Sequence, residues 1–410
     1  MQELSSYQKT FLDMVNNHIK FYPEYSFQLY FDNTKQPLIG KSKKIITAKF
    51  TNSSKVLKRI FTEGSLGLGE SYCQGLINVA DKDYKEFLFI FVRAAMDKKM
   101  LLSLPLITKL KVLKARFSGS FFTKENQHQN INAHYSLTEW FDNDDDSNKF
   151  YLYWLNSKYI QYTCAKWDKD TKNLEDAQRN KFEFYCKRLG INKNSKGKTL
   201  LDLGCGWGGF MFYVAEKYGL ICKGLTLSTA QAKYIKQEAK RRKANVTVDN
   251  INVHDMYGKY DYIASIGLLE HINDYNDLFK KTSLHLNKNG SVLFHAIHNN
   301  GLFYKPDSFL LKYVFPGGST PNIKTTVKTL KKYFKHVERN DLPYLSYPKT
   351  LTAWYTTFCK NEDKIRKLLK ENGKVKDIDF AIRIFKHYLV LCICGLTING
   401  FVANVLAKNE

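Results

Sequence analysis

The chain has 410 residues, enough for one large domain and a smaller one, and its 44% share of hydrophobic residues supports a sizeable core. Its formal net charge of +24 favours anionic partners, meaning phospholipid surfaces or nucleic acid, unless the charge only reflects a lysine-rich composition. Eight cysteines are scattered without a C-x-x-C pair or metal-ligand spacing, which argues against a disulfide framework and predicts no metal site.

The first 125 residues contain two segments with helical patterns. The first twenty residues form a polar, amphipathic pattern rather than a signal peptide, and Tyr84–Met96 is apolar enough for a buried helix. Residues 1–125 are therefore predicted to form a smaller, mainly helical domain.

Basic residues cluster in this region. Seven Lys or Arg and no acid lie between Ile39 and Arg59, and six and no acid lie between Lys98 and Arg116. The second cluster overlaps the amphipathic stretch Met100–Phe117, which could touch lipid or simply pack against other helices. The domain is accordingly predicted to face lipid or to form a dimer interface.

A glycine-rich turn follows the first predicted strand of the second region, residues 126–410. Thr199–Leu203 is a short apolar run typical of a buried parallel strand, and glycines follow it. A helix is predicted from about Gly208 to Tyr218, then a strand over Leu220–Leu225. Ser228 and Gln231 fit a capping box at the start of the next helix. This pattern predicts a nucleotide-binding βαβ unit, and a tight strand-to-helix turn without a ligand is the alternative.

The glycine spacing, G-x-G-x-G-G, differs from the dinucleotide spacing G-x-G-x-x-G. The loop also lacks the lysine that a phosphate-binding loop of the P-loop type carries. A nucleoside cofactor without phosphate therefore fits better, and S-adenosylmethionine is the common one.

Strands and helices continue to alternate after this unit. Strands are predicted over Asn245–Val253, Tyr260–Ile266 and Ser291–Ile297, with a helix over Tyr275–Leu286. Such alternation specifies an α/β fold with a doubly wound, Rossmann-like sheet, whose ligands bind at the carboxyl ends of the strands.

One uncharged stretch, Tyr388–Leu406, is nineteen residues long and approaches the length of a membrane span. Glycines, asparagines and a threonine interrupt its apolarity. A buried helix followed by an edge strand is the preferred interpretation.

Several motifs together resemble the cyclopropane-fatty-acyl-phospholipid synthase and mycolic acid cyclopropane synthase family of S-adenosylmethionine-dependent methyltransferases. EGSLGLGESY at Glu63–Tyr72 resembles the family's first-domain signature, and QYTCAKW at Gln161–Trp167 resembles its Y-S-C-A-Y-W segment. The motifs LDLGCGWGG, GLTLS, LLEH, FHAI, FPGG and SYPKTLTAW follow in the family's order.

The resemblance implies a set of residues that bind S-adenosylmethionine. They comprise a pair ahead of a cysteine, the glycine loop, two polar residues after the second strand, and two positions beside adenine: Tyr162, Thr163, Gly204, Cys205, Gly206, Thr226, Gln231, Asn252 and Val253. Gln231 has an alternative role, because helix capping alone would explain it.

The resemblance also implies a cage for a bicarbonate ion that acts as the general base. Its members are Cys164, Glu270, His295, Ile297 (through its backbone) and Tyr347. An alkene that attacks a sulfonium methyl becomes a carbocation, and the new methyl group must lose a proton to close the ring. A base beside that cation therefore has to work in a dry apolar tunnel. Alternatively, Glu270 could cap the following helix and His295 could be a hydrogen-bonded core residue.

By resemblance, the substrate is an unsaturated acyl chain of an anionic phospholipid bilayer, not nucleic acid. The protein is expected in the cytoplasm, peripherally bound to the inner face of the membrane, with a homodimer as a further expectation. Three segments depart from the family pattern: His134–Glu139, Asp341–Ser346 and Leu396–Asn399. They leave open a related C-methyltransferase that gives a methyl branch or acts on another apolar substrate, and a non-catalytic lipid-binding relative.

Overall fold

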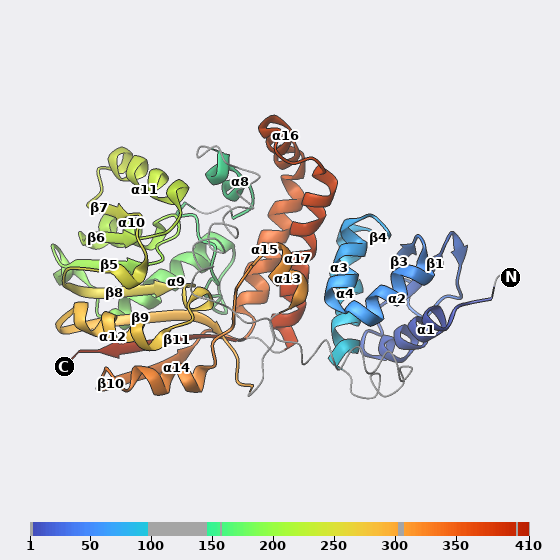
Figure 1. Cartoon of the computed structure of the whole chain (residues 1–410), viewed down its shortest axis with the longest axis horizontal. Helices are drawn as coiled ribbons and strands as arrows, with labels where there is room; N and C mark the ends of the chain where they lie inside the picture. The colour runs from blue at the N-terminus through green and yellow to red at the C-terminus, as the bar shows by residue number, and fades with distance from the viewer. Residues whose placement is uncertain (1–2, 97–145, 156–157, 302–306, 399–400, 410) are drawn as a thin grey trace. The chain divides into compact units, whose positions relative to one another are not determined.

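The computed structural model describes residues 3–96, 146–155, 158–301, 307–398 and 401–409 (Figure 1). The chain divides into two compact units. Unit 1 comprises Met1–Phe121, Asp307–Val314 and Val375–Ile398, and unit 2 comprises Phe122–Pro306, Phe315–Lys374 and Asn399–Glu410. The predicted boundary after residue 125 lies outside the described residues. The predicted division into residues 1–125 and 126–410 also places Asp307–Val314 and Val375–Ile398 in the second domain, whereas both segments belong to unit 1.

Unit 2 is built on a seven-stranded sheet with the order β10-β11-β9-β8-β5-β6-β7, which Figure 1 shows as a continuous stack. The strands from β5 to β9 pair in parallel, whereas β11 is antiparallel to both β9 and β10. The strands are β5 Thr199–Leu203, β6 Ile221–Leu225, β7 Val246–Asp249, β8 Tyr260–Ile266, β9 Leu286–His298, β10 His336–Asp341 and β11 Phe401–Lys408. This arrangement confirms the predicted doubly wound α/β fold.

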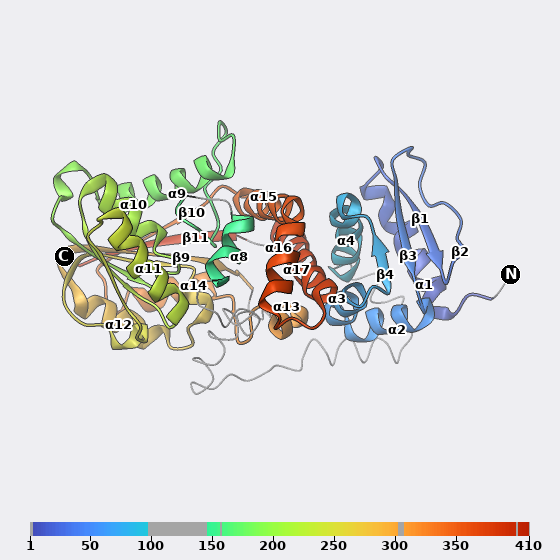
Figure 2. The same cartoon turned by 90° about the horizontal axis from the view of Figure 1, so that it is seen from above.

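Helices cover both faces of this sheet, and Figure 2 shows α9 and α12 on opposite sides of it. Apolar residues of α9, α10 and α11 fill one core cluster, and those of α12 and α14 fill another. The helices of unit 2 are α8 Asp146–Leu155, α9 Leu174–Leu189, α10 Gly209–Tyr218, α11 Thr229–Arg242, α12 Tyr275–His285, α14 Ile323–Leu330, α15 Ser346–Lys360 and α16 Glu362–Asn372. Short 3₁₀ turns lie at Lys193–Ser195, Val253–Asp255 and Leu269–His271.

Unit 1 is mainly helical, as predicted, but it also contains a four-stranded sheet, order β2-β1-β3-β4, that was not predicted. Strand β3 alternates exposed and buried residues, and β1 is buried along nearly its whole length. The alternation in β3 is a strand signal, although lysines lie in and around the strand. The elements are α1 Ser6–His18, a 3₁₀ turn Ile19–Phe21, β1 Ser26–Phe31, β2 Thr34–Lys35, β3 Ile45–Phe50, α2 Ser53–Glu63, α3 Ser65–Cys73, β4 Ile77–Val79, α4 Asp81–Met96, α13 Ser308–Tyr313 and α17 Ile378–Ile398.

The uncharged stretch near the C-terminus divides between the two units. In the described part of the chain, α17 is long and apolar enough to cross a membrane, and 67% of its most apolar window is buried inside the structure. It packs on α3 and α4 of unit 1. The predicted edge strand is β11, but it pairs on both sides, and β10 forms the edge instead. The basic stretch Met100–Phe117 lies outside the described residues.

Candidate active site

The glycine loop leaves β5 in a conformation that most side chains avoid. Gly204, Gly206 and Gly208 have φ angles of +69°, +53° and +75°, and Gly208 is the N-cap of α10. The Cys205 N–H donates to the Leu225 carbonyl at 3.0 Å, which ties the loop to β6. A Cβ placed on Gly206 would meet no atom within 4 Å, so the loop faces open space at this residue. The loop can therefore accept a ligand against its backbone.

Thr226 and Gln231 meet beyond the end of β6. The Thr226 hydroxyl donates to Gln231 Oε1 at 2.7 Å, and Ser228 Oγ accepts from the Gln231 backbone N–H. Ser228 therefore caps α11, but the Gln231 side chain does not complete the predicted capping box. Its Nε2 is buried without a hydrogen-bond partner in the described structure. A buried amide donor without a partner is costly, and a ligand oxygen at this place would satisfy it.

Asn252 and Val253 follow β7, at the same carboxyl edge of the sheet. The Asn252 side chain accepts from the His254 N–H at 3.0 Å and caps the short turn Val253–Asp255. Val253 is buried in the core cluster of α12 and α14. Asn252 therefore has a structural role, and contact with adenine stays a prediction for both residues.

Tyr162 and Thr163 lie on a segment that α9 and α15 hold in place. The Tyr162 ring lies 5.3 Å from Trp154 and 5.5 Å from Trp354, measured between ring centroids. Thr163 Oγ1 accepts from the Lys181 ammonium at 2.8 Å. The segment continues into Ala165, whose N–H donates to Thr350 on α15 at 3.0 Å.

Glu270 stands after β8 and reaches across to β9. Its Oε1 accepts from the Ile297 N–H at 2.8 Å, while its Oε2 is buried with no partner in the part of the chain that the structure describes. The residue is half-buried as a whole. Burial raises the pKa of this carboxyl to about 7, although the Ile297 N–H opposes the shift. Glu270 therefore does not cap α12, whose N-cap is Asp274.

His295 lies two residues before Ile297 on β9, on the same face of the strand. Its Nδ1 is 2.9 Å from Asn404 Oδ1 on β11, and the Asn404 amide group donates to the Asn340 carbonyl. This orientation of Asn404 places the histidine proton on Nδ1 and leaves Nε2 as an acceptor. Burial holds the pKa of His295 at about 3, so the imidazole stays neutral.

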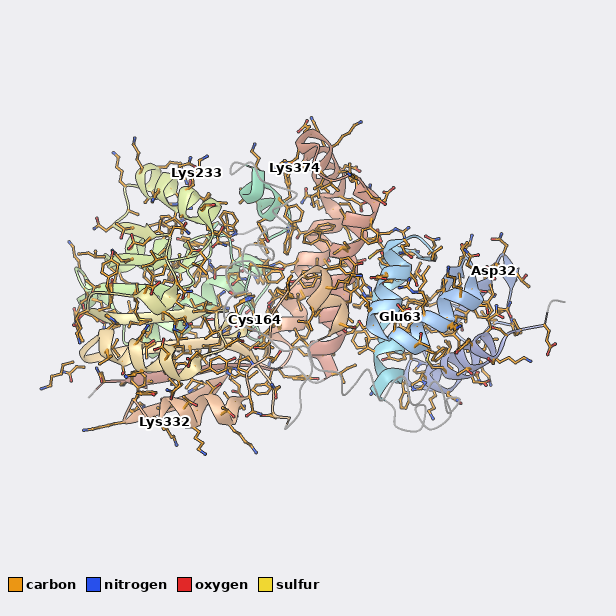
Figure 3. The ribbon with its side chains drawn as sticks, viewed as in Figure 1. Asp32, Glu63, Cys164, Lys233, Lys332 and Lys374 are labelled. Atoms are coloured by element: carbon orange, nitrogen blue, oxygen red, sulfur yellow. The ribbon has the colours of Figure 1, made fainter. Side chains whose placement is uncertain are left out.

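Cys164, Ile297 and Tyr347 pack in one small apolar cluster with Leu342 and Val402. Cys164 is 1% exposed and is surrounded by side chains, in contrast to the outward-pointing Lys233 and Lys332 (Figure 3). Burial raises the pKa of the Cys164 thiol, so it stays protonated and is no nucleophile.

The structure thus brings four of the five predicted cage residues into contact. Cys164, Ile297 and Tyr347 share the apolar cluster, and the Ile297 N–H hydrogen-bonds Glu270. The fifth, His295, lies two residues from Ile297 on β9. Other residues hold the site in place and were not predicted as part of it. Ser346 and Thr350 lie in the motif SYPKTLTAW, and Lys181, Tyr185 and Asn404 lie outside the motifs. Tyr185 and Lys181 are four residues apart on one face of α9, and a lysine within a largely apolar helical stripe was the available signal.

Comparison with known proteins identifies the family. The family described as mycolic acid cyclopropane synthetase matches residues 122–400, which is more than half of the chain. The chain belongs to this cyclopropane synthetase family.

Individual proteins and solved structures similar to this chain agree with that family. The chain is 30% identical over 339 residues to a cyclopropane-fatty-acyl-phospholipid synthase of Escherichia coli (strain K12), covering 82% of this chain and 80% of that one. It is 29% identical over 259 residues to a probable fatty acid methyltransferase of Pseudomonas putida, covering 60% and 63%. A crystal structure of a mycolic acid cyclopropane synthase complexed with SAH and CTAB aligns with a TM-score of 0.57 at 26% identity, covering 68% of this chain and 98% of that one. The protein is therefore an S-adenosylmethionine-dependent methyltransferase of the cyclopropane synthase type.

Proposed function

We propose that this protein transfers a methylene group from S-adenosylmethionine to the cis double bond of unsaturated acyl chains in membrane phospholipids, forming cyclopropane fatty acids. The observation that carries the proposal is the Glu270 carboxylate. One of its oxygens is fixed by the Ile297 N–H and the other is buried without a partner in the described structure. The similarity to the Escherichia coli synthase supports the phospholipid substrate.

The cofactor-binding residues fit a nucleoside with an amino-acid tail. The open space at Gly206 can accommodate a ligand, and the buried Gln231 Nε2 can donate a hydrogen bond to it. When bound, the cofactor supplies an electrophilic methyl group to the alkene.

The cage residues fit a small oxyanion with a proton of its own. His295 Nε2 can accept a hydrogen bond from the O–H of this group. Glu270 Oε2 can donate a hydrogen bond to the oxyanion when the carboxyl is protonated, or accept from the O–H when the carboxyl is charged. We propose bicarbonate as this group, supplying the base that removes a proton from the new methyl group. The apolar packing around Cys164, Ile297 and Tyr347 excludes water from the developing cation.

Aromatic rings provide the surroundings that such a cation needs. Tyr347 and Trp354 lie edge to face at 6.3 Å, seven residues apart on α15, and Tyr162 lies 5.5 Å from Trp354. Ring faces attract cations, and the attraction is worth about 2 kcal/mol when both partners are desolvated. The proposal assigns these rings to the carbocation.

A phospholipid substrate places the enzyme at a membrane surface. The net charge of +24 supports binding to the anionic inner face of a cytoplasmic membrane. We propose unit 1 as the part that contacts lipid or a second copy in a homodimer.

Fatty-acid methyl esters from cells that express the chain test this function. A new peak heavier by one methylene and without a double bond is the expected result. A heavier peak that is still unsaturated or branched would instead support a C-methyltransferase, as the name of the Pseudomonas putida relative suggests for that protein. No new peak, with intact S-adenosylmethionine binding, would leave a lipid-binding relative.

A further inference from the structure

Lys181 is a charged side chain with no contact to solvent. It lies on α9 and is 0% exposed, although fully buried lysines are rare unless they are paired. Its ammonium donates to Gln161 Oε1 at 2.9 Å and to Thr163 Oγ1 at 2.8 Å. Both acceptors flank Tyr162, so one side chain holds both ends of a three-residue segment.

The same helix grips this segment at a second point. Gln178 lies one turn before Lys181, and its Nε2 donates to the Thr163 carbonyl at 3.2 Å. Thr163 is also confined from the other side, because a Cβ on Gly267 would lie 2.7 Å from its methyl group. Its position is therefore set by α9 on one side and by the turn after β8 on the other.

We propose that Lys181 is a positioning residue for the cofactor, holding Gln161 and Thr163 so that Tyr162 and Thr163 present themselves to S-adenosylmethionine. The inference rests on the proposed function only for the identity of the cofactor. It assigns no contact between Lys181 and the reacting atoms.

The charges around Lys181 suit this role. The charged or titratable groups that interact with it are Cys164, Asp202 on β5 and His295 on β9. Burial lowers the pKa of Lys181 to about 7, and the Asp202 carboxylate opposes that shift. A neutral amine still has two N–H donors, enough for both acceptors, and it does not repel a cationic cofactor.

The test measures affinity for S-adenosylhomocysteine by calorimetry in the full chain. Lys181→Met keeps the apolar stem and removes both hydrogen bonds. We expect a roughly tenfold or larger loss of affinity and a matching rise in KM for S-adenosylmethionine, with kcat reduced less than threefold. Lys187→Met changes an exposed lysine of the same helix and should leave all three values unchanged.

Unchanged affinity in a folded Lys181→Met protein would overturn the proposal, even if its melting temperature falls. If that variant does not fold, the same affinity measurement on Gln161→Met tests the proposal, because this change removes one acceptor of the Lys181 ammonium and leaves the lysine in place. It should weaken affinity several-fold, and unchanged affinity would overturn the proposal. The proposed substrate is tested separately, since affinity for the cofactor product does not depend on any lipid.

Discussion

Two glutamates whose carboxylate oxygens are shielded from solvent, one in each unit, have opposite surroundings. Glu70 in unit 1 accepts from Arg59 at 2.5 Å, Lys312 at 2.6 Å and Tyr313 at 2.8 Å. Burial raises its pKa, but these hydrogen bonds outweigh that and hold it at about 2. Glu270 in unit 2 has one backbone donor and a pKa of about 7. A carboxylate with all its hydrogen bonds made, such as Glu70, links helices to one another. A carboxylate with a buried oxygen that has no partner in the described residues, such as Glu270, can bind a ligand there.

The surroundings of Glu70 explain the first-domain signature, EGSLGLGESY, as a structural motif. A Cβ on Gly69 would lie 2.3 Å from the Phe309 ring and 2.8 Å from His387 Nε2. Glycine thus lets α13 and α17 pack directly on α3. The His387 Nε2 is also buried without a partner in the described residues, but the backbone of α3 leaves no room for a ligand beside it.

The largest expected effect comes from replacing each of these glutamates separately with glutamine. We expect Glu270→Gln to reduce turnover by about 100-fold or more, because the amide removes the charge that orients the caged group. Affinity for S-adenosylhomocysteine should stay the same. Glu70→Gln should leave turnover per folded molecule unchanged. Near-normal turnover in Glu270→Gln would remove this residue from the chemistry.

His295→Gln and Tyr347→Phe extend the same test. Each should lose turnover with little change in cofactor affinity, and combined losses should fall short of the product of the single ones, because the residues act as one unit. Steady-state rates of single and double variants measure this. Fully multiplicative losses would mean that the residues act independently.

The second prediction concerns the glycine loop. We expect Gly206→Val to abolish S-adenosylmethionine binding, since a branched side chain would fill the open space at the loop and strain a φ of +53°. Gly197 is a matched control, with a φ of +79° and open space, but it lies outside the loop. Calorimetry on folded Gly206→Val that gives normal affinity, or equal losses in both variants, would remove the loop from the site.

The third prediction concerns the packing of unit 1. Gly69→Ala should cost about 1–3 kcal/mol of stability, because the methyl group overlaps Phe309 and helix backbones move little. Gly395→Ala, on α17 with open space around it, should be neutral or stabilising. Denaturant unfolding compares the two, and an equal effect would contradict the proposed close packing. Cofactor affinity should change in neither variant.

The fourth prediction concerns pH and uses the opposite pKa shifts. The folded-state pKa of Glu270 lies above the ordinary 4.5, so its stabilising contribution is present below pH 4.5 and is lost as pH rises through about 7. At pH 8 Glu270→Gln should therefore be more stable than the wild type by about 1 kcal/mol. The pKa of Glu70 is depressed, so its contribution is present above pH 4.5 and is lost as pH falls toward 2. Glu70→Gln should be less stable at pH 8, and shifts of the same sign in both variants would refute the contrast.

The smallest expected effect concerns membrane binding. Vesicles of anionic phospholipid should bind the protein more tightly than neutral vesicles, and binding should weaken with salt, since screening shortens to about 8 Å near physiological ionic strength. Arg59 will contribute little, because it pairs with Glu63 and Glu70. The exposed pair Lys41 and Lys43, changed to glutamine, should weaken binding. Equal binding to both vesicle types would show that the net charge only reflects composition.

The sequence predicted the parallel sheet well because each strand from Thr199 to Ile297 has its own apolar run and turn. Its motifs also named Cys164, Glu270, Ile297 and Tyr347, which lie close together in the structure, while their role as a cage stays a prediction. It missed the sheet of unit 1, where alternation was masked by lysines, and it placed β11 at the edge because pairing partners are not local information. The Gln231 side chain, which bonds Thr226 instead of completing a capping box, shows the same limit, since residue spacing does not say which of two nearby groups a side chain will choose.

The rate of cyclopropane formation by the wild-type protein, in buffer stripped of carbon dioxide, tests the central claim most directly. If the Glu270–His295 cage holds a bicarbonate base, cyclopropane formation on unsaturated phospholipid vesicles should slow after stripping and recover when bicarbonate is added. Glu270→Gln should show no such recovery. A wild-type rate that is unchanged by stripping and by added bicarbonate would contradict the claim, and the proton acceptor would then be a group of the protein itself.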